Sequence, residues 1–383
     1  MFAAKNEFFS PQQGYQISRS ARFRNSAGAY ITRPFATPTN SSKWTMSMWV
    51  KRGILSSSTI PALFGKTVSS VANFYLAFNS SDTLTWTFSN TNQMVTSAVF
   101  RDPSAWYHIV VQWNTTTGTA ANRVLLYVNG SQVTSFSTQT TASSSEQSEW
   151  NKAQANEIGR YAFNGTLYTD SYMAEVYFVD GQALTPSSFG AFDSTGVWQP
   201  LPYTGTYGTN GFYLNFSDNS SNTATTIGKD YSGNGNNWTP NNISVTSGAT
   251  YDSMTDVPTL TSATAANYCV LNPLNKSSLQ TISDGNLGIA SSGTTGGTLS
   301  TLAVSSGKYY WEYTAISLYT TNGYFAGGIA TENYYPQNQA SNDYGPGGPN
   351  SSGVSGVGTG ALYYPADTGI QLKVNGSTSS FAD

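Results

Sequence analysis

The sole histidine, His108, is the one residue of this sequence that could serve as the base of a catalytic triad. It lies inside a run that is apolar at nearly every position, residues 106–113, and no Gly-x-Ser-x-Gly elbow accompanies it to supply a nucleophile. We therefore predict a core histidine satisfied by a hydrogen bond rather than a general base.

Paired carboxylates are the second candidate for catalysis. Retaining glycosidases need two carboxyl groups about 5 Å apart. Glu146 and Glu149 lie close in sequence but within a serine-rich loop, and Glu175 and Asp180 are five residues apart, which places them on opposite faces of a strand. We predict no catalytic residues and a protein that is not an enzyme, with polysaccharide hydrolysis as a disfavoured alternative.

A glycine-rich loop that begins at Asp230 could bind calcium. Asp230, Asn234 and Asn236 offer a carboxylate and amide oxygens, which are the hard ligands that Ca²⁺ prefers. Asp170 and Asp193 could add ligands if the fold brought them close. The alternative, which the single carboxylate of the loop favours, is a tight turn closed by Asx hydrogen bonds and no cofactor.

Two tyrosine-rich loops are the candidates for ligand binding. Tyr334 and Tyr335 lie in one loop and Tyr344 at the tip of another, with Asn, Gly and Pro around them. Adaptable recognition loops use this composition. A plain solvated loop is the alternative at these positions.

The composition excludes several classes of protein. The 383 residues carry 17 Lys plus Arg and 20 Asp plus Glu, a net charge of −3, and 14% of them are aromatic. Seventeen basic residues make no obvious cationic face for nucleic acid, and no apolar run is long enough to span a membrane. Cys269 is the only cysteine, so no intrachain disulfide can form. The N-terminal residues lack the pattern of a secretory signal.

Short segments of alternating polarity predict an all-β protein. In residues 45–51, Met46, Met48 and Val50 share one face of a strand. Residues 73–78 and 84–88 should form a hairpin, and residues 106–113 a central strand. Asn129 and Gly130 predict a type I′ turn, because both residue types tolerate positive φ.

The connections between these strands suggest two domains. Residues 138–151 are polar and predict an exposed loop, residues 185–189 a short helical turn, and residues 217–250 a long connection. We expect an N-terminal arm over residues 1–14, a first domain over residues 15–250 and a second over residues 257–383. Residues 342–358 should be a mobile insertion in the second domain.

Five segments, in order, resemble the laminin G-like branch of the concanavalin A-like lectin/glucanase superfamily. They are residues 22–31, 44–51, 106–110, 126–130 and 174–185. The family usually opens with a strand followed by an Asp-Ser-Ser-Gly-Asn-Gly-like loop, and this signature comes late here, at residues 230–238. The resemblance implies a jelly-roll β-sandwich, and we expect residues 211–240 to return to it and to fill the first-strand position.

The second domain resembles a SPRY domain, which is a β-sandwich. Residues 307–313 look like its glycine-plus-aromatic strand, and residues 326–330 like the strand that follows. The later strands expected of the family are missing, so we expect either a fragment of a longer polypeptide or a sandwich completed by another element.

A laminin G-like domain followed by a SPRY-like domain looks like the architecture of virion proteins of marine tailed phages. This resemblance implies a structural protein of the phage particle: a tail fibre, spike or other surface appendage that binds a glycan or receptor on the host surface. Other virion proteins would be its partners, the arm would dock it to the particle, and a homo-oligomer such as a trimer is expected.

Three alternatives remain at this point. The chain could be a capsid or tail decoration protein whose partners are all virion proteins, which would bind no sugar. It could be a polysaccharide-degrading enzyme, or a cellular adhesion module, against which the missing leader and disulfides argue. Binding of purified protein to glycans distinguishes the first alternative from the host-binding hypothesis.

Overall fold

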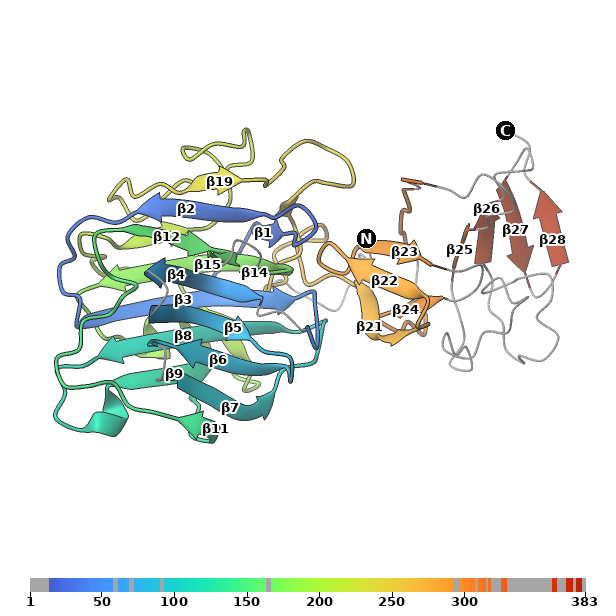
Figure 1. The fold of residues 1–383 in the computed structure, drawn as a ribbon. Helices are drawn as coiled ribbons and strands as arrows, with labels where there is room; N and C mark the ends of the chain where they lie inside the picture. The colour runs from blue at the N-terminus through green and yellow to red at the C-terminus, as the bar shows by residue number, and fades with distance from the viewer. Residues whose placement is uncertain are drawn as a thin grey trace. The chain divides into compact units, whose positions relative to one another are not determined.

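A computed structural model describes residues 14–57, 61–68, 72–89, 93–162, 167–292, 297–306, 309–314, 316–317, 325–328, 360–363, 370–374 and 377–380. The chain divides into two compact units. The first comprises residues 3–268 and 283–285, and the second residues 1–2, 269–282 and 286–383. Within the described residues the structure has strands and 3-10 turns but no α-helix, which confirms the predicted all-β class (Figure 1).

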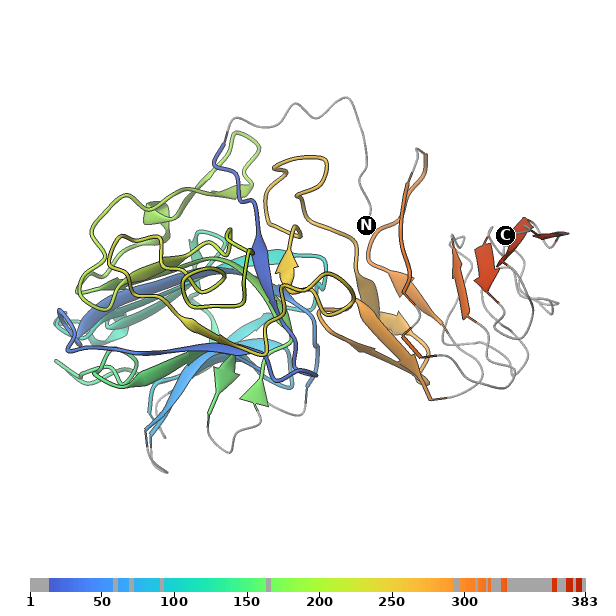
Figure 2. The same cartoon turned by 90° about the horizontal axis from the view of Figure 1, so that it is seen from above.

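The first unit is a sandwich of two antiparallel sheets (Figures 1 and 2). One sheet has the order β10-β9-β8-β3-β15-β1-β20, and β18 also pairs with β15. Its strands are β1 (Ser20–Phe23), β3 (Lys43–Arg52), β8 (Trp106–Asn114), β9 (Val124–Val128), β10 (Ser131–Gln132), β15 (Ser171–Asp180), β18 (Phe212–Leu214) and β20 (Ser253–Met254).

The second sheet has the order β11-β7-β6-β5-β4-β12-β2-β19. Its strands are β2 (Tyr30–Pro34), β4 (Ala62–Val68), β5 (Ala72–Phe78), β6 (Thr83–Thr87), β7 (Gln93–Val99), β11 (Phe136–Gln139), β12 (Ala155–Ile158) and β19 (Thr239–Asn241). Two ribbons, β13 (Arg160–Tyr161) with β14 (Leu167–Tyr168) and β16 (Gly190–Phe192) with β17 (Trp198–Pro200), and two 3-10 turns, η2 (Ala120–Asn122) and η4 (Pro186–Ser188), complete the unit.

Several local predictions are confirmed. Met46, Met48 and Val50 share the inner face of β3 and are fully buried in the core between the sheets. Strands β5 and β6 form the predicted hairpin, and β8 is central, between β9 and β3. Asn129 and Gly130 have φ values of 47° and 78°, as a type I′ turn requires. The turn η4 lies within residues 185–189.

The outer face of the first sheet is covered by other parts of the unit. Ser47 and Lys51, the polar residues that alternate with the core residues of β3, are fully buried. The Nζ of Lys51 donates to Asp256 Oδ2 at 2.7 Å and to the carbonyl oxygen of Tyr268 at 2.7 Å. Residues 257 and 265 pack on this face in one cluster, and residues 184, 189, 203 and 207 in another.

Because of these contacts, the first unit extends to residue 268, beyond the boundary that the sequence predicted before residue 257. Residues 257–268, which the sequence assigned to the second domain, lie in the first unit. The reason is the side chain of Asp256, which accepts hydrogen bonds from Lys51 and from Trp106 Nε1 of the first sheet. Residues 211–240 also contribute to both sheets: β18 pairs with β15, and β19 pairs with β2.

Residues 138–151 are not simply an exposed loop, so that prediction is wrong in part. Trp150 and Asn151 at its end are fully buried. The Trp150 ring packs in the core against Phe64, with ring centroids 4.7 Å apart, and Asn151 Nδ2 donates to Asp180 Oδ1 at 2.7 Å. The polar composition of the segment conceals these two anchoring residues.

The described strands that follow residue 269 form smaller sheets. They are β21 (Leu271–Lys276) with β24 (Thr298–Ser300), β22 (Gln280–Ser283) with β23 (Gly288–Ser291), and a sheet of β25 (Phe325–Gly328), β26 (Gly360–Tyr363), β27 (Ile370–Val374) and β28 (Ser377–Ser380).

One of the two strands quoted for the SPRY resemblance is absent. Residues 309–314 carry no strand, so the prediction of a strand over residues 307–313 is wrong in its described part. Tyr310 and Tyr313 are 63% and 54% exposed, and alternating aromatic residues form a strand only where a neighbouring strand and a buried face are available. Strand β25 lies where the following strand was expected. The SPRY-like fold itself stays a prediction.

Among the described residues, the structure contains no helix with the length and apolar character needed to cross a membrane.

Candidate functional site

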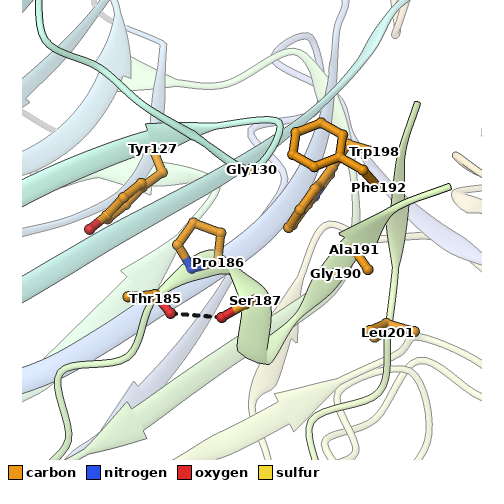
Figure 3. A pocket seen from close by; sticks show the side chains of 10 residues that line it. All are labelled: Tyr127, Gly130, Thr185, Pro186, Ser187, Gly190, Ala191, Phe192, Trp198 and Leu201. Atoms are coloured by element: carbon orange, nitrogen blue, oxygen red, sulfur yellow. Dashed lines mark hydrogen bonds between the residues drawn. The ribbon is translucent and has the colours of Figure 1, made fainter. Parts of the chain in front are cut away.

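An aromatic hollow lies on the outer face of the first sheet, beside the β16–β17 hairpin (Figure 3). Its volume is about 480 Å³. Strand β9 and its turn, η4, β16 and β17 provide its walls. The lining residues are Tyr127, Gly130, Thr185, Pro186, Ser187, Gly190, Ala191, Phe192, Trp198 and Leu201. We call this feature the aromatic hollow.

The hairpin holds two of the aromatic rings in place. Asp193, in its turn, accepts hydrogen bonds from the backbone N–H groups of Thr195 and Val197, at 2.8 and 3.0 Å. The Thr195 hydroxyl also donates to Asp193 Oδ1, and this bond, followed by the backbone bonds, lowers the pKa of Asp193. Phe192 and Trp198 are directly paired across the hairpin, and their rings meet edge to face with centroids 4.9 Å apart.

The position of the Trp198 side chain depends on a hydrogen bond to His108 and on close contact with two glycines. Its Nε1 donates to His108 Nδ1 at 2.9 Å. A Cβ on Gly130 would lie 2.3 Å from the Trp198 ring, and one on Gly190 2.5 Å from it. The glycines therefore let the indole lie flat against the backbone, while the partner Phe192 stays 55% exposed.

His108 has a structural role, as the sequence predicted. It is buried between Trp49 and Trp198, and its Nε2 is 2.8 Å from Ser47 Oγ. Because Nδ1 accepts from the indole, the proton of the neutral ring is on Nε2, which then donates to Ser47 and cannot take its proton. Burial lowers the pKa of His108 to about 3, so the ring stays neutral at pH 7.

The hollow has a neutral lining. None of its ten lining residues carries a charge. The hydroxyls of Thr185 and Ser187 lie at its rim and are hydrogen-bonded to each other at 2.8 Å, as the dashed line in Figure 3 shows. The hydroxyl of Tyr127 donates to Gln112, so its ring face is the part free for contact. This arrangement suits a ligand with apolar C–H faces and hydroxyl edges.

The carboxylates considered for catalysis are enclosed in separate hydrogen-bond networks. Glu175, at a bulge in β15 with φ of 51°, accepts hydrogen bonds from the hydroxyls of Tyr15, Tyr177 and Tyr213. Burial is the main cause of the raised pKa of Glu175. Asp180 instead accepts the backbone N–H groups of residues 39, 40 and 210 and the side chain of Asn151.

Glu146 and Glu149, the two carboxylates of the serine-rich loop, also have separate partners. Glu146 accepts the backbone N–H of Ser143, and Glu149 forms an ion pair with Lys152. Neither pair of carboxylates therefore faces a shared space in which a glycosidic bond could be cleaved.

The loop that begins at Asp230 is a hydrogen-bonded turn. Asp230 Oδ1 accepts the N–H groups of Tyr213 and Ser232, and Oδ2 accepts the Ser232 hydroxyl and the N–H of Asn236. Asn234 and Asn236 direct their Nδ2 groups at backbone carbonyls. These oxygens already have donors and the amides present N–H groups, so the loop does not fit calcium.

The other aspartates considered as ligands do not join Asp230. Asp193 closes the β16–β17 hairpin, and buried Asp170 accepts the backbone N–H of Gly285 at 2.7 Å. Across the described part of the chain, no group of three or more His, Cys, Asp or Glu side chains could hold a metal ion.

The tyrosines predicted to bind ligand, Tyr334, Tyr335 and Tyr344, lie outside the described residues. The aromatic hollow was missed because its rings come from elements far apart in the sequence. One local signal was available: Phe192 and Trp198 flank Asp193-Ser194-Thr195-Gly196-Val197, a short turn-forming segment typical of a hairpin with two aromatic residues across its ends.

Comparison with known proteins agrees with this sandwich. Residues 25–189 match the family model described as concanavalin A-like lectin/glucanases superfamily. The first unit carries a concanavalin A-like domain. A search of curated proteins gave no match.

Similarity to solved structures is low. A candidate carbohydrate-binding protein from Bacteroides ovatus is 18% identical, with a TM-score of 0.41, and the match covers 59% of each chain. A heptameric SAP-like pentraxin from Limulus polyphemus is 16% identical, with a TM-score of 0.31, covering 44% of this chain and 78% of that one. Domains LG4-5 of the mouse laminin α1 chain are 11% identical, with a TM-score of 0.32, covering 55% of this chain and 50% of that one.

Proposed function

We propose that this protein is a non-enzymatic carbohydrate-binding component of a phage particle, part of a tail fibre, spike or other surface appendage, and that the aromatic hollow is where it contacts a host glycan. The hollow carries the proposal, because a rigid aromatic platform with a neutral lining is suited to the flat C–H face of a sugar ring. The virion setting is supported by the combined sequence resemblance described above.

The hollow favours a neutral sugar. Trp198 and Phe192 provide apolar contact, and Thr185 and Ser187 provide hydroxyls that exchange their mutual hydrogen bond for bonds to the ligand. A carboxylate or sulfate group would find no cation among the lining residues. The absence of a fitting calcium loop at Asp230 further suggests that binding does not depend on calcium.

The structure offers support for binding rather than hydrolysis. The neutral His108 donates to Ser47, and Glu175 and Asp180 belong to separate networks. A polysaccharide-degrading enzyme would need a paired acid and nucleophile facing one cleft. Release of reducing ends from an envelope polysaccharide by the purified protein would reverse this part of the proposal.

The test is binding of the purified protein to an array of neutral and acidic glycans, followed by titration calorimetry with the best ligand. Phe192→Ala should weaken binding about tenfold, since burying a half-exposed phenylalanine contributes about 1.4 kcal/mol. Val99→Ala, at an exposed apolar residue that does not line the hollow, is the matched control and should bind like the wild type.

Two results would contradict the proposal. If no glycan binds, the decoration-protein alternative, with virion proteins as the only partners, gains support. If a glycan binds equally well to the wild type and to Phe192→Ala, the site lies elsewhere, and the loops with Tyr334, Tyr335 and Tyr344 become the next candidates.

A further inference from the structure

Three polar side chains lie next to one another across the second sheet. Gly65 of β4 pairs with Glu157 of β12, so the antiparallel register places the next residue, Lys66, opposite Asn156. Asn156 in turn pairs with Arg33 of β2. Strands β4, β12 and β2 are adjacent in Figure 1. Directly paired residues point to the same face of a sheet, so these three form one row, the Lys66–Asn156–Arg33 row.

The row faces the interior of the sandwich. Lys66 also pairs with Phe74, which is fully buried in the core between the sheets. Lys66 is 6% exposed and Asn156 is 0% exposed. Their polar atoms are therefore removed from water, where each needs a partner to offset its lost hydration.

The buried atoms of the row lack such partners. Among the described residues, no hydrogen-bond partner is found for Lys66 Nζ, for Asn156 Oδ1 and Nδ2, or for Nη1, one terminal nitrogen of Arg33. The other terminal nitrogen of Arg33 donates to Asn236. Ammonium and guanidinium groups can only donate, so the row has more unpaired donors than acceptors.

The charges around the row do not balance. Three cations, Lys66, Arg33 and Lys152, interact with two carboxylates, Glu149 and Asp230. Glu149 forms its ion pair with Lys152, and Asp230 accepts three hydrogen bonds within its own turn and one from the backbone N–H of Tyr213. Within the part of the chain that the structure describes, this leaves one more positive than negative charge around the row. Burial lowers the pKa of Lys66 to about 8, so its ammonium is still mostly protonated at pH 7.

We propose that the Lys66–Asn156–Arg33 row binds a small inorganic anion, with chloride as the representative ligand. The anion would accept hydrogen bonds from the lysine ammonium, the arginine Nη1 and the asparagine amide. These atoms are closed off from solvent, so we choose a monatomic anion as the ligand. A buried water could also accept hydrogen bonds there, but it would leave the charge uncompensated.

This site is independent of the proposed glycan binding. The row lies on the inner face of the second sheet, whereas the aromatic hollow lies on the outer face of the first. Its ligand would stabilise the sandwich without contacting a sugar. Failure of one proposal therefore leaves the other standing.

The test is thermal unfolding of the full chain at pH 7 and constant ionic strength, with chloride replacing gluconate. Binding to the folded state should raise the midpoint of the first unit by roughly 2 to 4 °C as chloride passes its dissociation constant by tenfold. Bromide should act like chloride. Lys66→Met should abolish the dependence, and the control Lys229→Met, at an exposed cation beside Tyr231, should keep it.

A second variant supplies the anion from within the chain. Asn156→Asp places a carboxylate beside Lys66 with almost no change of volume, so it should raise the midpoint in gluconate and remove the response to chloride. If Lys66→Met does not fold, this variant and anomalous diffraction from wild-type crystals soaked in bromide decide the question. A wild type indifferent to chloride, or an equal response in the wild type and Asn156→Asp, would overturn the proposal.

Discussion

Trp198→Phe tests the packing that holds the aromatic hollow. The substitution keeps an aromatic ring over Gly130 and Gly190 but removes the indole N–H that donates to His108 Nδ1 at 2.9 Å. His108 is 1% exposed, so water cannot replace that donor without opening the site. The histidine is left with a buried acceptor and no partner.

The expected loss is about 1–3 kcal/mol in the free energy of unfolding of the first unit, which is the usual cost of an unsatisfied buried hydrogen-bonding group. For a unit of this size, the thermal midpoint should fall by roughly 2–4 °C for each kcal/mol. Urea unfolding followed by circular dichroism measures the change, because the loss of a tryptophan alters the fluorescence signal itself.

Phe192→Leu is the control for this measurement. It changes the exposed ring that packs on Trp198 but leaves the hydrogen bond to His108 intact. The control should stay within about 0.5 kcal/mol of the wild type, as surface substitutions generally do. If Trp198→Phe also stays within that range, the hydrogen bond does not fix the platform, and the reasoning about the histidine tautomer fails with it.

Three further predictions concern buried or enclosed carboxylates. Burial raises the pKa of Asp170 to about 7, so between about pH 4 and pH 7 the folded state keeps a proton that the unfolded state has released, and the contribution of Asp170 to the free energy of unfolding falls as the pH rises. In urea titrations across this range, the free energy of unfolding of Asp170→Asn relative to the wild type should rise by up to about 4 kcal/mol. A difference that does not change with pH would contradict this explanation. Lys51→Met leaves the buried Asp256 without its counter-charge and should lower the free energy of unfolding by about 3–5 kcal/mol in the same assay, whereas a loss below about 1 kcal/mol would mean that the pair is hydrated. Because the oxygens of Asp230 already accept four hydrogen bonds, EDTA and calcium should leave the thermal midpoint unchanged in scanning calorimetry; a calcium-dependent rise would restore the metal hypothesis.

The sequence was a good guide wherever a local pattern decides the structure. The alternation at Met46, Met48 and Val50 predicted which face of β3 is buried, and Asn129-Gly130 predicted a turn with two positive φ values. The lack of a nucleophile elbow near His108 predicted its structural role. In each case a single strand or turn carries the necessary information.

The sequence failed where a distant segment changes the environment of a residue. Lys51 alternates with the core residues of β3, and nothing in that alternation indicates that Asp256 and Tyr268 bury its side chain. Residues 309–314 have the aromatic alternation of a strand, but Tyr310 and Tyr313 are exposed and no strand forms. Alternation specifies two faces and does not say what covers either.

The pattern of apolar and turn-forming residues was enough to predict an all-β protein, because strand periodicity and turn chemistry act over a few residues, and the sandwich followed from the family resemblance. The candidate ligand sites could not be predicted in this way. The aromatic hollow joins Tyr127 of β9 to Phe192 and Trp198 of a later hairpin, and the inner row joins Lys66, Asn156 and Arg33 from three strands. Such sites depend on the register and order of strands, which long-range pairing sets and which no short segment encodes.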